Sequence, residues 1–332
     1  MVSTKSFSQL LASNEPVVCA EGYVFELQRR GYCQAGPYVP EILLEKPEVV
    51  RILHEEFAHA GSDIMVACQY YANRYKLNLL GKADQFEKLN RIALQLCRDV
   101  AKETGTLAAG NLCNSVEYMP SDGEKIQDVW NMFKEQIHWS IENNMELFIC
   151  ETFRDSREAR VPCVVTLAPY ADQTEDGVSF LSALTRLHNE GAAMVGLNCA
   201  RGPETMLPLL REIRKSYQGP LAALPVPFRT TAEDPTWTTL PDPKTGTVAF
   251  PDDIDSVACG CQDIHEFGVA CRQLDIRYAG LCCGNSARYT RALAEGMGKT
   301  NVKASRFSTD MTYSVWKKDQ AAALKKKQQE KK

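Results

Sequence analysis

The chain has 332 residues, of which 44% are hydrophobic and 24% charged, and its formal net charge at pH 7 is −4. This is the composition of an ordinary soluble globular protein, and the length suits one large α/β barrel or two smaller domains. The slightly acidic balance argues against nucleic acid as the main partner, because phosphate binding needs a basic face. No apolar run approaches the roughly 18 residues of a membrane helix, so we predict no membrane association.

The chain contains 13 cysteines, and residues 1–16 lack the basic and then apolar pattern of a secretory signal. Cysteines without such a signal indicate a reducing compartment, in which thiols stay reduced. We therefore expect a cytoplasmic protein whose cysteines are used as thiols.

Taken in chain order, short apolar segments alternate with helical patterns. The predicted strands are residues 17–20, 64–67, 107–110, 147–150, 164–167, 194–199, 221–224 and 278–281. The predicted helices are residues 47–60, 86–103, 124–143, 180–189, 204–216, 256–274 and 287–297. Residues 23–46 are predicted to form an aromatic, Pro-containing loop. Strands that alternate with helices in this way predict an α/β fold, a (β/α)8 TIM barrel rather than an open sheet.

The barrel is expected to span residues 17–298, after an N-terminal lead-in of residues 1–16. Residues 299–332 are polar and end in a lysine-rich run, which predicts a basic, partly disordered extension. The fourth crossover is shortened, because only residues 151–163 connect the fourth and fifth predicted strands. A complete crossover needs at least about 10–12 residues, so we expect a thin or open wall beside Glu151, or a missing segment.

Polar and reactive residues follow the predicted strands at the point where each strand ends. They are Glu21, Tyr70, Tyr71, Asn111, Glu151, Asn198, Cys199, Cys282 and Cys283. The C-terminal ends of the strands form the rim on which barrel enzymes carry their active sites. Unrelated core cysteines would have no reason to share that rim. The sequence therefore predicts an active site built from these side chains.

Three of these rim residues are cysteines: Cys282 and Cys283 follow the last strand, and Cys199 ends the sixth. Adjacent cysteines are poor disulfide partners for each other, because the ring they would close is strained, but each can supply a thiolate to zinc. Three protein ligands leave one position open, which is the catalytic arrangement of zinc and suits the binding of a substrate thiol. The alternative is a set of three reduced core thiols.

Five segments carry a family resemblance. They are Phe25–Gly31, Ala35–Glu41, Phe57–Gly61, Gly196–Cys199 and Gly280–Gly284. These segments resemble the homocysteine S-methyltransferase family, and most closely its betaine–homocysteine branch. The resemblance runs from about residue 17 to about residue 293. It implies a zinc-bound homocysteine thiolate that takes a methyl group from a positively charged donor, giving methionine.

The resemblance also assigns roles by position. Cys199, Cys282 and Cys283 would be the zinc ligands. The expected substrate-binding residues are Glu21, Gly22, Tyr38, Tyr70, Tyr71, Glu151 and Asn198, and among them Glu151 and Tyr71 are also expected to position the reactants. The three tyrosines are candidates for a cage around a small onium donor, a quaternary ammonium or a sulfonium, because aromatic faces attract cations. The expected partners are small molecules, homocysteine and the donor, and a homo-oligomer is left open.

Departures from the family pattern concentrate on the donor pocket. Tyr23 stands where the family usually has a second glycine, and Val66 where it usually has glutamine. Tyr38 replaces the tryptophan usual in the betaine branch, and Thr152 replaces a tyrosine. Methyl transfer is thus better supported than betaine as the donor. These departures also keep open a second function, a catalytically degenerate zinc-binding barrel that acts as a binding or scaffold protein.

Simpler interpretations of other residues stay open. The alternative for Glu21 and Glu151 is a role as helix-capping carboxylates, and Tyr70 and Tyr71 are as often core aromatics as cation-binding faces. The pair Cys259 and Cys261 flanks a glycine at a helix start with no matching partner, so we interpret it as structural.

Overall fold

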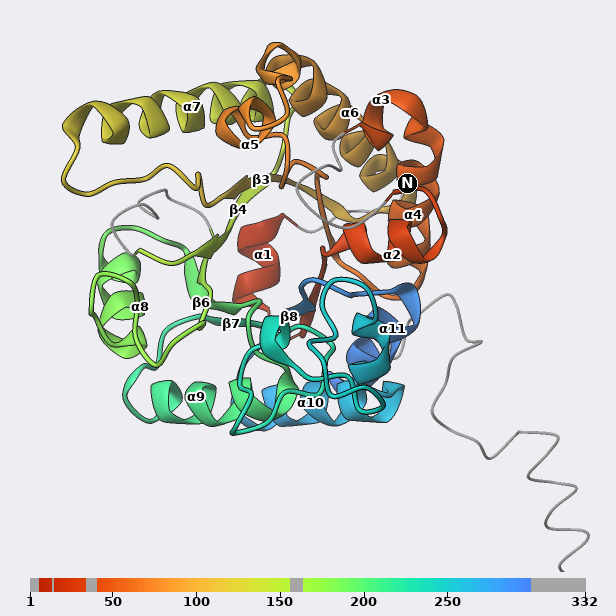
Figure 1. Cartoon of the computed structure of the whole chain (residues 1–332), viewed down its shortest axis with the longest axis vertical. Coiled ribbons are helices and arrows are strands. Elements are labelled where there is room, and N and C mark those ends of the chain that lie inside the picture. The colour runs from red at the N-terminus through yellow and green to blue at the C-terminus, as the bar shows by residue number, and fades with distance from the viewer. Residues whose placement is uncertain (1–5, 14, 34–40, 156–163, 300–332) are drawn as a thin grey trace, which may run out of the picture.

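The computed structural model describes residues 6–13, 15–33, 41–155 and 164–299. Its centre is a closed barrel of eight parallel strands (Figure 1). The strands are β1 Val17–Ala20, β2 Ile64–Val66, β3 Leu107–Cys113, β4 Leu147–Phe153, β5 Val164–Leu167, β6 Met194–Asn198, β7 Leu221–Leu224 and β8 Tyr278–Leu281. Each strand pairs with the next, and β8 closes the barrel by pairing in parallel with β1. The predicted (β/α)8 barrel is confirmed.

Helices surround the strands in Figure 1. They are α2 Tyr23–Arg29, α3 Ile42–Glu45, α4 Pro47–His59, α5 Arg74–Asn78, α6 Phe86–Thr104, α7 Gly123–Glu142, α8 Phe180–Asn189, α9 Pro203–Ser216, α10 Cys261–Gln273 and α11 Ala287–Gly296, with 3-10 turns at Ala83–Gln85, Trp237–Thr239 and Ile254–Val257. No helix in the described ranges is both long and apolar enough to cross a membrane.

The apolar runs of the strands follow from their position between the barrel interior and the helices. Every residue of β5 is buried, as expected for parallel strands covered on both faces. The long helix α6 presents an apolar stripe to this layer, with Leu89, Ala93 and Val100 among its buried residues. It ends at Gly105, whose φ of +76° is the left-handed conformation that glycine adopts easily.

The lead-in contains a short helix that the sequence did not predict, α1, Phe7–Ala12. Ser6 and Gln9 form a capping box at its start. Its residues Phe7, Leu10 and Leu11 pack against side chains at the first positions of several strands. Those positions mark the N-terminal mouth of the barrel, so α1 covers the end opposite the rim, and Figure 1 shows it at the centre of the ring.

Two predictions of local structure are wrong. Residues 23–46 are not one loop, because α2 and α3 both form within their described part. Gly22, in a left-handed conformation with φ +81°, redirects the chain from β1 directly into α2. The strands β3 and β4 also extend beyond the predicted ends, to Cys113 and Phe153, and carry their polar residues on the strands themselves.

The predicted short crossover lies between β4 and β5, which pair directly with a register shift between Cys150 and Phe153. Residues 156–163 lie outside the described residues, so the thin wall beside Glu151 stays a prediction. The predicted extension also lies outside them from residue 300 onward.

Candidate functional site

The three predicted metal-ligating cysteines come together at the C-terminal rim. Cys199 follows β6, and Cys282 and Cys283 follow β8. The sulfur of Cys283 lies 3.9 Å from that of Cys199 and 3.9 Å from that of Cys282. All three sulfurs lie within 4.8 Å of one another, close enough to bind one metal ion. Cys199 and Cys282 are buried and Cys283 is half-buried.

The three thiols differ in the direction in which their pKa values are shifted. Hydrogen bonds from the thiols of Cys282 and Cys283 hold the pKa of Cys199 well below its usual value. The pKa values of Cys282 and Cys283 are raised well above the usual value, and the hydrogen bond of each thiol with Cys199 is the first cause. The hydrogen bonds among the three thiols therefore favour deprotonation of Cys199 over that of Cys282 and Cys283. A soft divalent cation in this position would replace the remaining protons, which is how thiolate metal sites form.

The backbone that carries the cluster is strained. Cys199 and Ala200 have φ values of +60° and +55°, in the left-handed region that few residues other than glycine adopt. Thr152, beside Glu151 on β4, has φ +63°. Hydrogen bonds hold these conformations: the Thr152 amide donates to Asn198 Oδ1 at 2.9 Å, and the amide of Trp237 donates to the Ala200 carbonyl at 2.9 Å. Non-glycine residues in this region cluster at functional sites.

Two buried carboxyl groups face the cluster. One oxygen each from Glu21 and Glu151 and the sulfur of Cys282 all lie within 4.8 Å of one another. Glu151 accepts hydrogen bonds from Asn111 Nδ2 at 2.7 Å and from Asn198 Nδ2 at 3.3 Å. Neither carboxyl oxygen of Glu21 has a hydrogen-bond partner in the described part of the chain, although the side chain is buried. Such a buried, unpartnered carboxyl group is suited to receive a donor from a ligand.

Burial changes the ionisation of this pair. It raises the pKa of Glu151 to about 7, against the hydrogen bond from Asn111, which lowers it. Burial also raises the pKa of Glu21 well above its usual value, and the charge of Glu151 adds to the effect. The two carboxyl groups therefore do not both ionise readily near neutral pH. A cationic group placed between them would stabilise their charged forms.

A cavity opens between these carboxyl groups and the loops that follow β1 and β2. Its lining includes Glu21, Gly22, Tyr23, Val24, Phe25, Val66, Ala67, Cys68, Tyr70, Tyr71, Asn111, Glu151, Cys282 and Cys283. The rings of Tyr70 and Tyr71 meet edge to face, with centroids 5.0 Å apart. The cavity thus joins two of the clustered thiols, both carboxyl groups and two aromatic faces in one space.

A buried lysine already occupies part of the aromatic surface. Lys76 Nζ lies 3.9 Å from the ring centroid of Tyr70 and 5.8 Å from that of Tyr71. It also donates to the Tyr70 carbonyl at 3.1 Å and to Cys113 Sγ at 3.1 Å. Nothing in the sequence singles out Lys76, because a lysine between Tyr75 and Leu77 in a short polar segment is typical of the protein surface.

The structure brings together every predicted site residue that it describes: Glu21, Gly22, Tyr70, Tyr71, Glu151, Asn198, Cys199, Cys282 and Cys283. Tyr38 lies outside the described residues. Asn111 was placed on the rim without a role, and it proves to be the nearest hydrogen-bond donor to Glu151. Cys259 and Cys261 are not part of a metal-binding group among the described residues.

A second residue that the sequence did not indicate is Gln69. Its side-chain oxygen accepts from the Asn111 amide at 2.9 Å, and its nitrogen donates to Asn90 Oδ1 at 2.7 Å. This buried network fixes the end of β3 and therefore the asparagine that holds Glu151. The sequence feature that could have indicated it is a polar residue three positions after the end of β2, between Cys68 and Tyr70.

The fold and the site define a barrel enzyme with a thiol-rich centre at the C-terminal rim. Comparison with known proteins identifies the family of this enzyme. Residues 18–297 match the family model for homocysteine S-methyltransferase. The chain belongs to the homocysteine S-methyltransferase family and is a methyltransferase.

Relatives and solved structures agree with this assignment. The chain is 31% identical over 308 residues to betaine–homocysteine S-methyltransferase 1 of Xenopus laevis, covering 88% of this chain and 75% of that protein. It is 30% identical over 303 residues to the protein of the same name from Rattus norvegicus, covering 86% and 73%. The metallated form of the homocysteine methyltransferase MmuM from Escherichia coli has a similar fold, with a TM-score of 0.66 and 17% identity over 86% of this chain and 98% of that one.

Proposed function

We propose that this methyltransferase moves a methyl group from a small onium donor to the thiol of homocysteine, giving methionine. The observation that carries the proposal is the cluster of three thiols within 4.8 Å of one another, beside a cavity that also holds two buried carboxyl groups. A substrate that bears both a thiol and an ammonium group complements the two halves of this site. Family membership and the names of the relatives agree with it.

We infer that zinc is the cofactor and that Cys199, Cys282 and Cys283 hold it. The donor set fits, because zinc binds thiolates and takes three protein ligands where it leaves a position for substrate. Bound zinc would keep a substrate thiol deprotonated near neutral pH, where a free thiol with a pKa near 8.5 is mostly protonated. The cavity side of the cluster, lined by Cys282 and Cys283, is where that thiol would approach.

The carboxyl groups are assigned to the amino end of homocysteine. Glu21 has two buried oxygens without partners, and an ammonium group would supply the missing donors. The charge of that ammonium would also lower the raised pKa values of Glu21 and Glu151. Glu151 is oriented by Asn111 and Asn198, so it positions the substrate relative to the thiol cluster.

The donor is assigned to the aromatic side of the cavity. In the transfer, the bond from the methyl carbon to the donor nitrogen or sulfur breaks, a bond to the substrate sulfur forms, and the donor loses its positive charge. An apolar, poorly hydrated pocket favours a reaction that removes charge. Tyr71 is the assigned cation-binding face, together with Tyr38, while Lys76 covers the face of Tyr70.

The experiment combines metal content with product formation. Purified protein should contain about one zinc per chain and should form methionine from homocysteine with one member of a panel of quaternary ammonium and sulfonium donors. Cys282→Ala should lose zinc and activity together, whereas Cys271→Ala, which removes a buried thiol from α10 outside the cluster, should keep both. Stoichiometric zinc in Cys282→Ala would overturn the ligand assignment. If the protein binds zinc but none of the donors in the panel methylates homocysteine, the result would favour the degenerate barrel. No observation in the described residues now supports that alternative.

A further inference from the structure

Glu21 and two of the clustered thiols lie on two segments whose backbone pairing ends at the rim. The strands β1 and β8 pair in parallel as far as Ala20 and Leu281. Glu21 and Cys282 are the next residues of the two segments. No backbone hydrogen bond joins residues 21–30 to residues 282–290, all of which the structure describes. The position of residues 282–286, the cysteine turn, relative to α2 therefore depends on side chains and on close packing.

Asn285 makes one connection between the two segments. Its side chain is only 1% exposed, and its Nδ2 donates to the carbonyl oxygen of Glu21 at 3.1 Å. Its Oδ1 accepts from the Ser286 amide at 2.8 Å and from the Thr290 hydroxyl at 3.2 Å. The two accepted bonds orient the side-chain amide within its own segment. The donated bond then reaches the residue whose carboxyl group faces the thiol cluster.

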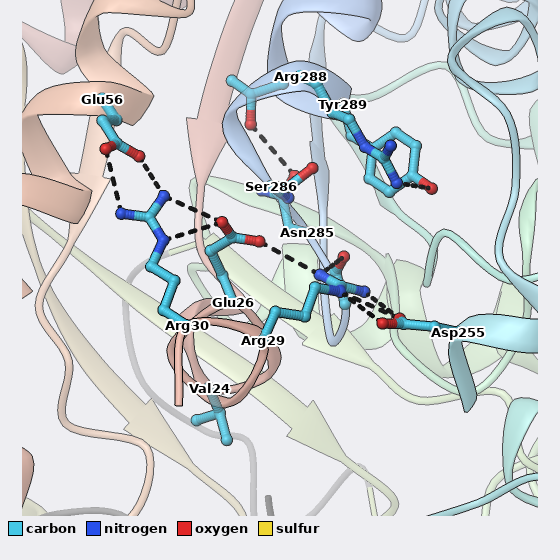
Figure 2. A network of polar contacts seen from close by, with 12 residues as sticks. Val24, Glu26, Arg29, Arg30, Glu56, Asp255, Asn285, Ser286, Arg288 and Tyr289 are labelled. Atoms are coloured by element: carbon cyan, nitrogen blue, oxygen red, sulfur yellow. Dashed lines mark hydrogen bonds and ion pairs between the residues drawn. The ribbon is translucent and has the colours of Figure 1, made fainter. Parts of the chain in front are cut away.

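Arg29, the last residue of α2, makes a second connection. Its Nη1 donates to the carbonyl oxygen of Gly284 at 3.2 Å. The guanidinium is itself held by Asp255 at 2.7 Å and by Glu26 at 3.4 Å, as Figure 2 shows. Gly284 has no room to shift toward the ring of Phe228, because a Cβ on it would lie 2.6 Å from that ring. The cysteine turn is therefore held at Gly284 as well as at Asn285.

From these contacts we propose that Asn285 and Arg29 are positioning residues that determine which amino thiol the enzyme accepts. The proposal rests on the function proposed above, in which Glu21 receives the ammonium group of homocysteine and the cysteine turn carries two zinc ligands. Neither Asn285 nor Arg29 lines the cavity, so both act through Glu21 and the cysteine turn. Together they fix the distance between the amino-binding and the thiol-binding halves of the site.

That distance selects the chain length of the substrate. An amino thiol has to reach from Glu21 to the thiol cluster, so the number of methylene groups between its two ends must match their separation. Homocysteine has one methylene more than cysteine, a difference that a fitted site converts into roughly 10–200-fold in kcat/KM. A small displacement of the cysteine turn relative to Glu21 would reduce this preference, because catalysis tolerates little misplacement of the reacting atoms.

A purely structural role of Asn285 and Arg29 predicts a different result. Loss of a structural contact lowers the stability and the fraction of active enzyme for every substrate alike. The ratio of kcat/KM for homocysteine to kcat/KM for cysteine does not depend on the concentration of active enzyme. A change in this ratio therefore identifies a positioning role.

The test measures that ratio in the zinc-loaded wild type and in two variants, with the methyl donor that the wild type uses best. Asn285→Asp keeps the size and the accepting oxygen of the side chain but removes the donor to the Glu21 carbonyl. The ratio should fall about tenfold, mainly through a raised KM for homocysteine, while the KM for the donor stays unchanged. Arg29→Gln should lower the ratio severalfold, because the contact of Asn285 with Glu21 remains.

Two control variants lie away from the site. Asn143→Ala removes a side chain that donates to the Trp139 carbonyl at 2.8 Å at the end of α7. Arg51→Gln breaks an ion pair of α4, in which Arg51 lies 3.0 Å from Glu55. Both controls should keep the ratio of the wild type. Arg29→Gln decides the question if Asn285→Asp does not fold, because the side chain of Arg29 is 22% exposed and tolerates replacement better.

The proposal is overturned if the wild type does not prefer homocysteine to cysteine. It is also overturned if every positioning variant that folds keeps the preference of the wild type, or if the controls lower the ratio as much as the positioning variants do. In these cases methyl transfer to homocysteine by the wild type still supports the proposed function. A wild type that methylates no amino thiol overturns the proposed function and this proposal together.

Discussion

Gly22 is the residue at which the fold and the thiol site depend most directly on each other. A Cβ at this position would lie 2.1 Å from the Cys282 carbonyl oxygen and 2.7 Å from its carbonyl carbon. These are backbone atoms of a proposed metal-ligating residue, so they cannot move without moving the sulfur. The φ of Gly22 is also +81°, which an alanine adopts only with strain. Gly22→Ala should therefore damage both stability and metal binding.

Gly31 allows the two effects to be separated. Its φ is +76°, close to that of Gly22, but a Cβ there would meet no atom within 4 Å. Gly31→Ala should cost only the left-handed strain, about 1–2 kcal/mol. Gly22→Ala should cost that strain and a further overlap term of about 1–3 kcal/mol, about 2–5 kcal/mol in all.

Urea denaturation of the wild type and both variants measures these costs, and metal content after gel filtration reports on the site. We expect Gly31→Ala to keep its zinc and Gly22→Ala to lose most of it. Equal destabilisation of the two variants, with zinc retained in both, would refute the argument that the β1 and β8 loops are locked together at this contact.

Three further predictions concern buried polar groups. Burial lowers the pKa of His54 to about 4, so between pH 6.5 and 4 the unfolded chain binds a proton that the native state does not. Stability should fall by up to about 3 kcal/mol as the pH drops through that window, and His54→Met should remove this slope while exposed His59→Met keeps it. Asn198→Ala leaves the Thr152 amide without its acceptor and should cost about 1–3 kcal/mol in urea denaturation, with a raised KM for homocysteine. Lys76→Met removes a buried ammonium from the aromatic side of the cavity and should lower the KM for a cationic donor more than it changes the KM for homocysteine.

The barrel and its thiol cluster could be predicted because both follow from local sequence. Short apolar runs that alternate with helices are specific for this architecture, and residues directly after the strands must lie on one rim. Cys199 and Cys282 are 83 positions apart in the chain, yet the topology alone placed both on one rim, at the ends of β6 and β8 with only β7 between them. The pairing register of the strands did not need to be known to predict that these cysteines share the rim.

The features that escaped prediction depend on contacts between distant segments. Lys76 and Gln69 are ordinary polar residues in sequence, and their roles arise from what the fold places beside them. The start of α2 was missed because Gly22 replaces the expected turn with a single left-handed residue. Such a position is visible in sequence only as a glycine, which many loops contain.

The position of Lys76 changes how the donor pocket is to be understood. From the sequence, Tyr70 and Tyr71 were equivalent faces for a cationic donor. In the fold, the ammonium of Lys76 covers the ring of Tyr70, and its charge also acts to lower the pKa of Glu151. The lysine thus favours an ionised carboxylate on the homocysteine side while it repels cations from one aromatic face. A donor cation is then expected on the side of Tyr71, because Lys76 Nζ lies 5.8 Å from the centroid of that ring and only 3.9 Å from that of Tyr70.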